Sequence, residues 1–323
     1  MMIAWQLGLL FLGFFLLIKG ADYLIKGASA LAKGANISAI TIGLTIVSLG
    51  TSMPEIIVNI LASSQGHSTM VFANVIGANI FNLFVILGIL GLIYPVTLRS
   101  QTVWKEIPIL IGTTLLVFFL TNDILILDKE TNGLDKIDAL VLILVYILFM
   151  WYVFTNFRTT GKKRLVKFEV KTFNVKKAWL FIIGGSIATS LGGQLVVEKA
   201  IWITEFFTIS QRLISLTVIA TFTSLPELTT SIIAILRKNS DLAIGNIIGS
   251  SMFNFLLVLS LSSFFNDLTY PKGLNFDLNF YLFGVILLFL SMFTGKTKKL
   301  QRWEGFIFLV FFVAYLYFIF IRM

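Results

Sequence analysis

Long stretches of mostly apolar residues recur along the whole chain, and they constrain its fold more than any other feature. Runs of about 18 or more such residues can cross about 30 Å of bilayer hydrocarbon as helices. Only 13% of the residues are charged, whereas a soluble domain carries about 25%. We therefore predict an all-α polytopic membrane protein with about ten transmembrane helices. The expected spans are 2–18, 37–64, 70–96, 106–120, 137–157, 178–197, 213–236, 242–264, 278–294 and 305–321.

The basic residues predict an orientation for these spans. If the N-terminus lies outside, 19 of the 25 Lys and Arg residues fall in cytoplasmic segments, as the positive-inside rule requires. We therefore expect both termini outside. The small size of the chain and the lack of a regulatory loop favour the plasma (inner) membrane of a prokaryote. The basic stretch 158–177 is interpreted as a cytoplasmic linker that anchors orientation and can contact anionic lipid. The net charge of +9 is explained in this way, and no nucleic-acid partner is expected.

An internal repeat divides the chain into two halves. The motif at 51–55, Thr-Ser-Met-Pro-Glu, recurs at 223–227 as Thr-Ser-Leu-Pro-Glu, and Asn-Val-Ile-Gly at 74–77 recurs at 246–249 as Asn-Ile-Ile-Gly. The offset is the same for both blocks, so the two copies are in register without a gap. Each half contains five expected spans, and an odd number inverts the second half relative to the first. Secondary transporters often have this plan, with the binding site at the midplane where the repeats meet. We predict two inverted five-helix repeats, 1–157 and 178–323, joined by the linker 158–177.

Two glutamates within the repeated motifs, Glu55 and Glu227, are the notable charges of the predicted motif spans. A carboxylate at membrane depth is costly and persists mainly where it has a partner or a function. Neither motif offers a Lys or Arg at matching depth, so a bound cation would supply the positive charge. Each glutamate directly follows a proline, which removes a backbone donor and frees carbonyls about four residues earlier. Such carbonyls can bind cations where they line a polar cavity.

Hydroxyl and amide side chains near the two glutamates complete a set of oxygen ligands. Asn82 follows Glu55 at the same spacing as Asn254 follows the second glutamate, each on the next expected helix. Calcium takes about six to eight oxygen ligands, and two carboxylates match its charge; sodium accepts the same oxygens. Transition metals favour imidazole or thiolate, but the chain has no cysteine and one histidine. The candidate ligands are Glu55, Glu227, Thr51, Thr223, Asn82, Asn254, Ser52, Ser224, Ser250 and Ser48.

Structural roles are the alternatives for these residues. Protonated Glu55 and Glu227 would hydrogen-bond helices together without binding an ion. Asn82 and Asn254 would do the same, as small polar residues often do between membrane helices.

The motif blocks resemble the signature repeats of the sodium/calcium exchangers in the cation/calcium antiporter superfamily. The blocks are 50–55 with 74–82, and 223–227 with 245–254. The resemblance covers essentially the whole chain and implies ten helices, an inverted repeat and a diamond of ion sites. It implies that Glu55 and Glu227 coordinate calcium and share sodium, that Thr51 and Thr223 add oxygens, and that Asn82, Asn254, Ser250, Ser52 and Ser224 belong to surrounding sodium sites. The chain departs from the family at Ala78, where serine is frequent, Ser251, where asparagine is usual, and Asn254, where some members have aspartate.

The function expected from these residues is exchange of Ca²⁺ for Na⁺ by alternating access. An empty site would bury uncompensated negative charge, so the unloaded protein should not switch faces readily. Switching would be a slide of the first spans of each half against the rest. A calcium/proton exchanger that uses the same glutamates stays open, as does a passive cation channel. An enzyme is not expected, nor is any cofactor. The ion ratio, potassium dependence and oligomeric state are left open, with a monomer as the expectation.

Overall fold

The computed structural model describes residues 2–35, 37–122, 132–160, 174–206, 224–295 and 298–322. Within this part of the chain, eight helices are long and apolar enough to cross a membrane, or nine if a pair bent by 50° at Ser52 counts as one span. They match nine of the ten expected spans in order. The remaining span, 213–236, lies partly outside the described residues, and its described part is helix α13 (Leu225–Leu236). The prediction of an all-α polytopic membrane protein is confirmed.

The described residues form two compact units. Unit 1 comprises Met1–Pro54 and Phe149–Ser250, and unit 2 comprises Glu55–Leu148 and Ser251–Met323. Each unit therefore takes segments from both halves of the sequence repeat. The borders between the units fall inside helices α4 (Met53–Ser64), α9 (Lys136–Thr160) and α14 (Ser240–Met252).

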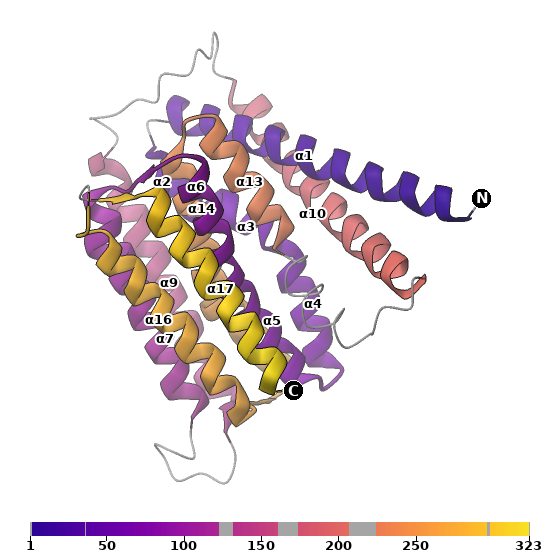
Figure 1. Cartoon of the computed structure of the whole chain (residues 1–323). Coiled ribbons are helices and arrows are strands. Elements are labelled where there is room, and N and C mark those ends of the chain that lie inside the picture. The colour runs from indigo at the N-terminus through magenta and orange to yellow at the C-terminus, as the bar shows by residue number, and fades with distance from the viewer. Residues whose placement is uncertain are drawn as a thin grey trace. The chain divides into compact units, whose positions relative to one another are not determined.

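Unit 1 is organised around two long helices that lie side by side, α1 (Met2–Gly34) and α10 (Val175–Phe206) (Figure 1). Small residues recur at every seventh position along their contact. Gly20 and Gly185 approach so closely that a Cβ on either would overlap main-chain atoms of the other helix. Small residues of this kind let membrane helices pack backbone against backbone. Gly13 lies against Gly192 and Gly27 against Ala178, so the two helices run antiparallel.

The predicted end of the first span, at residue 18, is wrong. Helix α1 continues well beyond it, to Gly34. At 33 residues it is about 50 Å long, so it exceeds the hydrocarbon thickness and has room for charges. Hydropathy drops at Lys19, but the close packing against α10 supports the helix beyond that point.

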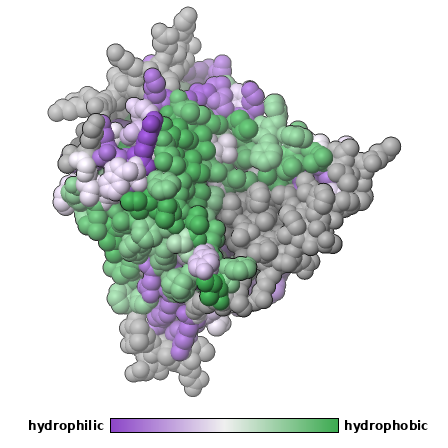
Figure 2. Space-filling view, viewed as in Figure 1, coloured by the Kyte–Doolittle hydropathy of each residue, from purple (hydrophilic) through white to green (hydrophobic). Residues whose placement is uncertain are grey.

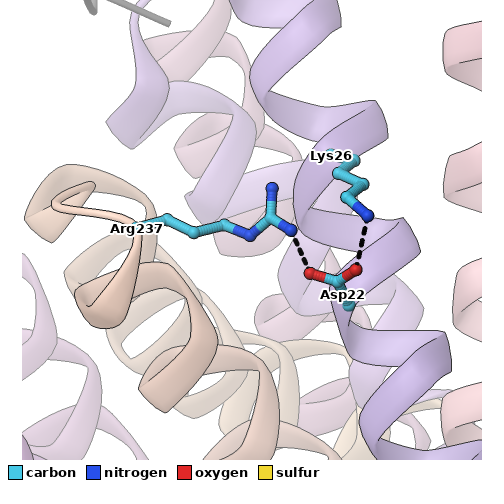
Figure 3. A network of polar contacts seen from close by, with 3 residues as sticks. All are labelled: Asp22, Lys26 and Arg237. Atoms are coloured by element: carbon cyan, nitrogen blue, oxygen red, sulfur yellow. Dashed lines mark hydrogen bonds and ion pairs between the residues drawn. The ribbon is translucent and has the colours of Figure 1, made fainter.

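Charged side chains on the second half of α1 form an ion network with the end of α13 (Figure 3). Lys26 Nζ lies 2.6 Å from Asp22 Oδ2, one turn along the same helix. Arg237, which directly follows the last residue of α13, pairs with the other oxygen of Asp22. A carboxylate between two cations offsets the cost of holding charge within a long apolar helix. Three of the charges that interrupt the apolar pattern are thus paired within unit 1.

The rest of unit 1 is a broken helix and the segments packed on it. The first part of the broken span runs through α2 (Ala39–Ile42), the π-helical segment η1 (Gly43–Val47) and α3 (Ser48–Thr51). Gly43 and Gly249 make close contacts between this segment and α14. Helix α13 packs on both α1 and α3.

Unit 2 contains continuous spans that pack as a bundle. Aromatic rings fill its core, with Phe84 stacked on Phe280 at 4.6 Å. Large apolar side chains cover the outer faces of α9 and α17, and Figure 2 shows a hydrophobic surface over this bundle with hydrophilic residues at its ends, as a lipid-facing protein requires. Its elements are α5 (Ser68–Ile80), η2 (Phe81–Ile86), α6 (Leu87–Ile93), η3 (Thr102–Glu106), α7 (Ile107–Thr121), η5 (Phe253–Val258), α15 (Leu259–Phe265), η6 (Lys272–Leu274), α16 (Asn275–Ser291) and α17 (Arg302–Arg322).

Two short antiparallel strand pairs join the loops of unit 2. Strand β1 (Val96–Thr97) pairs with β4 (Lys299–Leu300), and β2 (Gly133–Leu134) pairs with β3 (Leu268–Thr269). The strands β1 and β3 are themselves separated by the offset of the sequence repeat. Each pair therefore ties a loop of the first half of the sequence to a loop of the second.

The sequence repeat is reproduced by the element boundaries. Helices α4 and α13 start and end at equivalent positions of the two repeats, and so do α5 and α14, η2 and η5, and α6 and α15. Equal boundaries at a constant offset show that, within the described residues, both halves build the same succession of a helix that starts in the motif, a second helix and a π-helical segment.

Candidate functional site

The repeated Thr-Ser-x-Pro-Glu motif is in both cases the start of a helix. Ser52 and Ser224 stand before α4 and α13 with nearly the same backbone angles, φ −87° and ψ 6° for Ser52 and φ −90° and ψ 9° for Ser224. Pro54 and Pro226 follow in the first turn, where a proline costs little because its missing N–H has no intrahelical acceptor. The motif thus breaks the first span at Ser52, and in both repeats a helix begins two residues before the glutamate.

Both glutamates are buried, Glu55 at 2% exposure and Glu227 at 1%. Each lies in the first turn of its helix. The N-terminal end of a helix carries a partial positive charge that favours a carboxylate. The helix start therefore offsets part of the cost of burying each charge, but it does not neutralise it.

The candidate residues around Glu227 lie in unit 1. Ser52 Oγ donates a hydrogen bond of 2.9 Å to Glu227 Oε1, and Ser250 Oγ approaches the same oxygen at 3.5 Å. Among the residues that the structure describes, Glu227 Oε2 has no hydrogen-bond partner. Two hydroxyls thus hold one carboxylate oxygen and leave the other available as a ligand.

Asn246 connects the residues around Glu227 to one another. Its Oδ1 lies 3.1 Å from Thr51 Oγ1, and its Nδ2 donates to Ser231 Oγ at 3.0 Å and to the main-chain oxygen of Glu227 at 3.4 Å. The first part of the broken span, which ends at Thr51, and helix α13, which contains Glu227, are therefore held together through the side-chain amide of Asn246.

Glu55 and a second group of candidate residues lie in unit 2. Asn59, one turn along α4, donates from Nδ2 to the main-chain oxygen of Glu55 at 2.7 Å. Asn254 Nδ2 donates to Asn79 Oδ1 at 3.1 Å. Asn82 and Asn254 are each 1% exposed. Their Oδ1 atoms have no hydrogen-bond partner within the described part of the chain, so this unit holds buried amide oxygens of the kind that bind hard cations.

Asn82 and Asn254 occupy equivalent places in two π-helical segments. Each is the second residue of its segment, η2 or η5. Their carbonyls accept the N–H of Leu87 and of Leu259, as the wider turn of a π-helix requires. Such segments are rare and often occur at functional sites, because the inserted residue redirects side chains.

The structure thus brings together several of the predicted ligands. Thr51, Ser52, Ser250 and Glu227 cluster in unit 1, whereas Glu55, Asn82 and Asn254 belong to unit 2. Ser48 donates to the carbonyl of Thr45 at 3.2 Å and packs against Gly249. Ser224 is fully buried, and its Oγ has no partner among the described residues. Thr223 lies outside the described residues.

Sequence reasoning did not single out Asn246, Asn59 or Asn79 as site residues. Asn246 belongs to the second repeated block, so its recurrence was visible although its contacts were not. Asn59 lies four positions after Glu55, and a helical projection of α4 places them on one face. Within the described ranges, no group of three or more His, Cys, Asp or Glu side chains could hold a metal ion.

The chain is similar to known ion exchangers along most of its length. A sequence profile described as sodium/calcium exchanger protein matches residues 5–155 and 177–321. The antiporter CaxA of Alkalimonas amylolytica is 34% identical, over 84% of this chain and 85% of that protein. The sodium/calcium exchanger MaX1 of Methanosarcina acetivorans is 28% identical, over 95% of this chain and 96% of that one. A structure of the sodium-calcium exchanger NCX_Mj, soaked with Na⁺ and Sr²⁺, has a TM-score of 0.83 and 27% identity, and the match covers 97% of this chain and 98% of that one.

Proposed function

This chain belongs to the sodium/calcium exchanger family and is a Ca²⁺/Na⁺ antiporter, and on that premise we propose that Glu55 and Glu227 ligate the transported cations. One observation supports this assignment most directly. Glu227 is 1% exposed, two serine hydroxyls converge on its Oε1, and Oε2 has no hydrogen-bond partner among the described residues. A buried carboxylate arranged in this way is costly unless a cation binds it. The repeat places Glu55 in the same position of the first half.

The further ligands we propose are Thr51, Ser52, Ser250, Asn82 and Asn254, with Thr223, Ser224 and Ser48 as additional candidates. Carboxylate, hydroxyl and amide oxygens suit both Ca²⁺ and Na⁺. Ala78, Ser251 and Asn254 are the positions where the chain departs from the family pattern, and we propose that they affect sodium binding more than calcium binding.

The exchange mechanism follows from charge. Without a cation the site holds up to two buried negative charges, and this raises the energy of any state closed to water. One Ca²⁺ or several Na⁺ can compensate the charge, so the two ions compete for Glu55 and Glu227. Only a loaded protein then passes between the two faces. We propose that α1 and α10 move as one rigid body in this step, because their backbones are in direct contact at Gly20 and Gly185.

Flux into proteoliposomes tests the function. We expect Ca²⁺ uptake when an outward Na⁺ gradient is imposed, and none when a K⁺ gradient or a pH step is imposed without Na⁺. Uptake driven by the pH step alone would assign calcium/proton exchange instead. Uptake that needs no counter-ion gradient and shows no counterflow would indicate a channel.

Glu55→Gln and Glu227→Gln test the ligands. Each is expected to lower the exchange rate about a hundredfold or more, because breaking a buried charge pair costs about 3–5 kcal/mol and each 1.4 kcal/mol is a factor of about ten. Glu198→Gln is the matched control, since Glu198 lies on α10 and is 54% exposed. Wild-type rates in both glutamate variants would refute the assignment.

We also propose a plasma-membrane location with both termini outside and the segment 158–177 in the cytoplasm. The chain contains no cysteine, so single cysteines can be introduced without a background. A membrane-impermeant maleimide added to intact cells should label a cysteine at Lys129 and not one at Lys163. The reverse pattern would invert the proposed orientation.

A further inference from the structure

Helix α4 carries a polar face that continues beyond its glutamate. Glu55, Asn59 and Ser63 follow one another at every fourth position and are 2%, 1% and 0% exposed. Residues at this spacing lie on one side of a helix. The opposite side carries Ile57 and Leu61, each 54% exposed. A fully buried row of oxygen-bearing side chains is unusual in a membrane helix, where such groups are costly.

The amide of Asn59 is held in one orientation. The main-chain oxygen of Glu55 can only accept a hydrogen bond, so the Asn59 atom that contacts it at 2.7 Å is the donor Nδ2. The amide oxygen Oδ1 therefore points away from that carbonyl. Within the described residues, Oδ1 has no hydrogen-bond partner and is buried. A buried carbonyl oxygen without a donor is destabilising, and a hard cation is the ligand that such an oxygen binds.

Oxygen atoms continue along the same face toward the C-terminal end of α4. Ser63 Oγ donates to the main-chain oxygen of Ser262 at 2.5 Å, which links α4 to α15 inside unit 2. Ser262 Oγ is itself fully buried and has no partner in the described part of the chain. From Glu55 the polar face thus extends two helical turns to a second helix that also offers an unpaired oxygen.

The other half of the repeat does not reproduce this face. The position equivalent to Asn59 is Ser231, whose hydroxyl accepts a hydrogen bond from Asn246 at 3.0 Å. The position equivalent to Ser63 is Ile235, and Leu90 stands where α15 has Ser262. The polar face of α4 is therefore not a by-product of the duplicated motif, because α13 lacks it.

We propose that Asn59 Oδ1 is a further cation ligand, one helical turn beyond Glu55, at the start of an oxygen-lined face that continues to Ser63 and Ser262. A partly dehydrated Na⁺ or Ca²⁺ on its way to Glu55 occupies this position. The inference rests on the proposed exchange function, because it adds a ligand to the same transported ion. Asn59 then affects which ion reaches the glutamate as well as how fast it arrives.

Two substitutions separate ligation from a purely structural role. Asn59→Leu removes both the oxygen and the donor to Glu55. Asn59→Asp keeps an oxygen at the same place but loses the donor. Ser64→Ala is the matched control, because Ser64 is the neighbouring exposed residue of α4 and its Oγ donates to the main-chain oxygen of Leu61 in the same helix.

The measurement is Na⁺-driven Ca²⁺ uptake into proteoliposomes at sub-saturating Ca²⁺, together with the Na⁺ concentration that half-inhibits uptake. We expect Asn59→Leu to lower uptake about tenfold, which corresponds to about 1.4 kcal/mol. Asn59→Asp should retain exchange and require several-fold more Na⁺ for half-inhibition, since added negative charge favours the divalent ion. Ser64→Ala should match the wild type.

Each contrary outcome has a distinct meaning. An Asn59→Leu protein with wild-type uptake overturns the inference while the exchange function stands. Equal losses of Ca²⁺ uptake in both Asn59 variants, with an unchanged Na⁺ concentration for half-inhibition, also overturn the inference. In that case the role of Asn59 is to hold the main-chain carbonyl of Glu55. If Asn59→Leu elutes as an aggregate, the test rests on the Na⁺ concentration that half-inhibits uptake by Asn59→Asp. A half-inhibiting concentration equal to that of the wild type then overturns the inference. A wild-type protein that does not exchange Ca²⁺ for Na⁺ refutes the proposed function itself, and the inference falls with it.

Discussion

The contact between α1 and α10 makes opposite predictions for two neighbouring glycines of α10. Gly185 lies against α1, where a Cβ would stand 2.7 Å from the main-chain oxygen of Gly20 and 2.8 Å from the Cα of Leu24. Around a Cβ on Gly184, no atom of the described residues lies within 4 Å. We expect Gly185→Ala to destabilise the protein and Gly184→Ala to leave it unchanged or stabilise it.

The difference between the two variants isolates the helix contact. Both replace glycine by alanine in the interior of the same helix, which by itself favours folding by about 0.8–1.0 kcal/mol. Forcing a methyl group into a packed contact costs about 1–3 kcal/mol, and here it meets backbone atoms that cannot rotate away. The net change for Gly185→Ala is then a loss of about 0–2 kcal/mol, and the difference between the variants is about 1–3 kcal/mol.

The assay is thermal unfolding of the purified proteins in one detergent at one scan rate, followed by exchange rates in proteoliposomes. Unfolding of large membrane proteins is often irreversible, so the variants are compared under identical conditions. A lower Tm for Gly185→Ala than for Gly184→Ala supports the contact. The same Tm for both variants, or a lower Tm for Gly184→Ala, would refute the close packing of the two backbones.

Three further predictions follow from the polar contacts. Ca²⁺ at about a hundred times its Kd should stabilise the wild type by about 2.7 kcal/mol, measured as a rise in Tm, and Glu227→Gln should lose this rise. Ser52→Ala should weaken Ca²⁺ binding about tenfold in a titration, because hydrogen bonds to charged groups contribute about 1.5–3 kcal/mol and Ser52 holds Glu227 Oε1 at 2.9 Å; unchanged binding would show that the hydroxyl is dispensable. Asp22→Asn should lower stability by about 0.2–1 kcal/mol because the pair is partly exposed, and Arg237→Gln should add little in that background; full additivity in denaturation would contradict the pairing.

The sequence alone predicted the membrane fold and the break at the first motif. Apolar runs and the internal repeat are properties of neighbouring residues and of simple periodicity, so they need no knowledge of distant contacts. Proline in the first turn and the acid that follows it are likewise local signals, and they correctly marked the region where α4 and α13 begin.

Only the tertiary structure decided which polar groups contact one another. Ser52 and Glu227 lie in different halves of the chain, and nothing local indicates that one hydroxyl holds the other residue's carboxylate. The helical length of α1 was also underestimated, because hydropathy registers the charge of Lys19 but not the glycine contacts with α10 that support the helix.

Asn59 shows most clearly which properties follow from local sequence and which follow from tertiary packing. Its spacing from Glu55 is a local fact, but the orientation of its amide depends on a hydrogen bond, and its burial depends on packing within unit 2. Local sequence fixes where oxygen atoms lie along each helix. Which of those oxygens lose their water and their protein partners, and so become ligands, is set by how helices distant in sequence pack together.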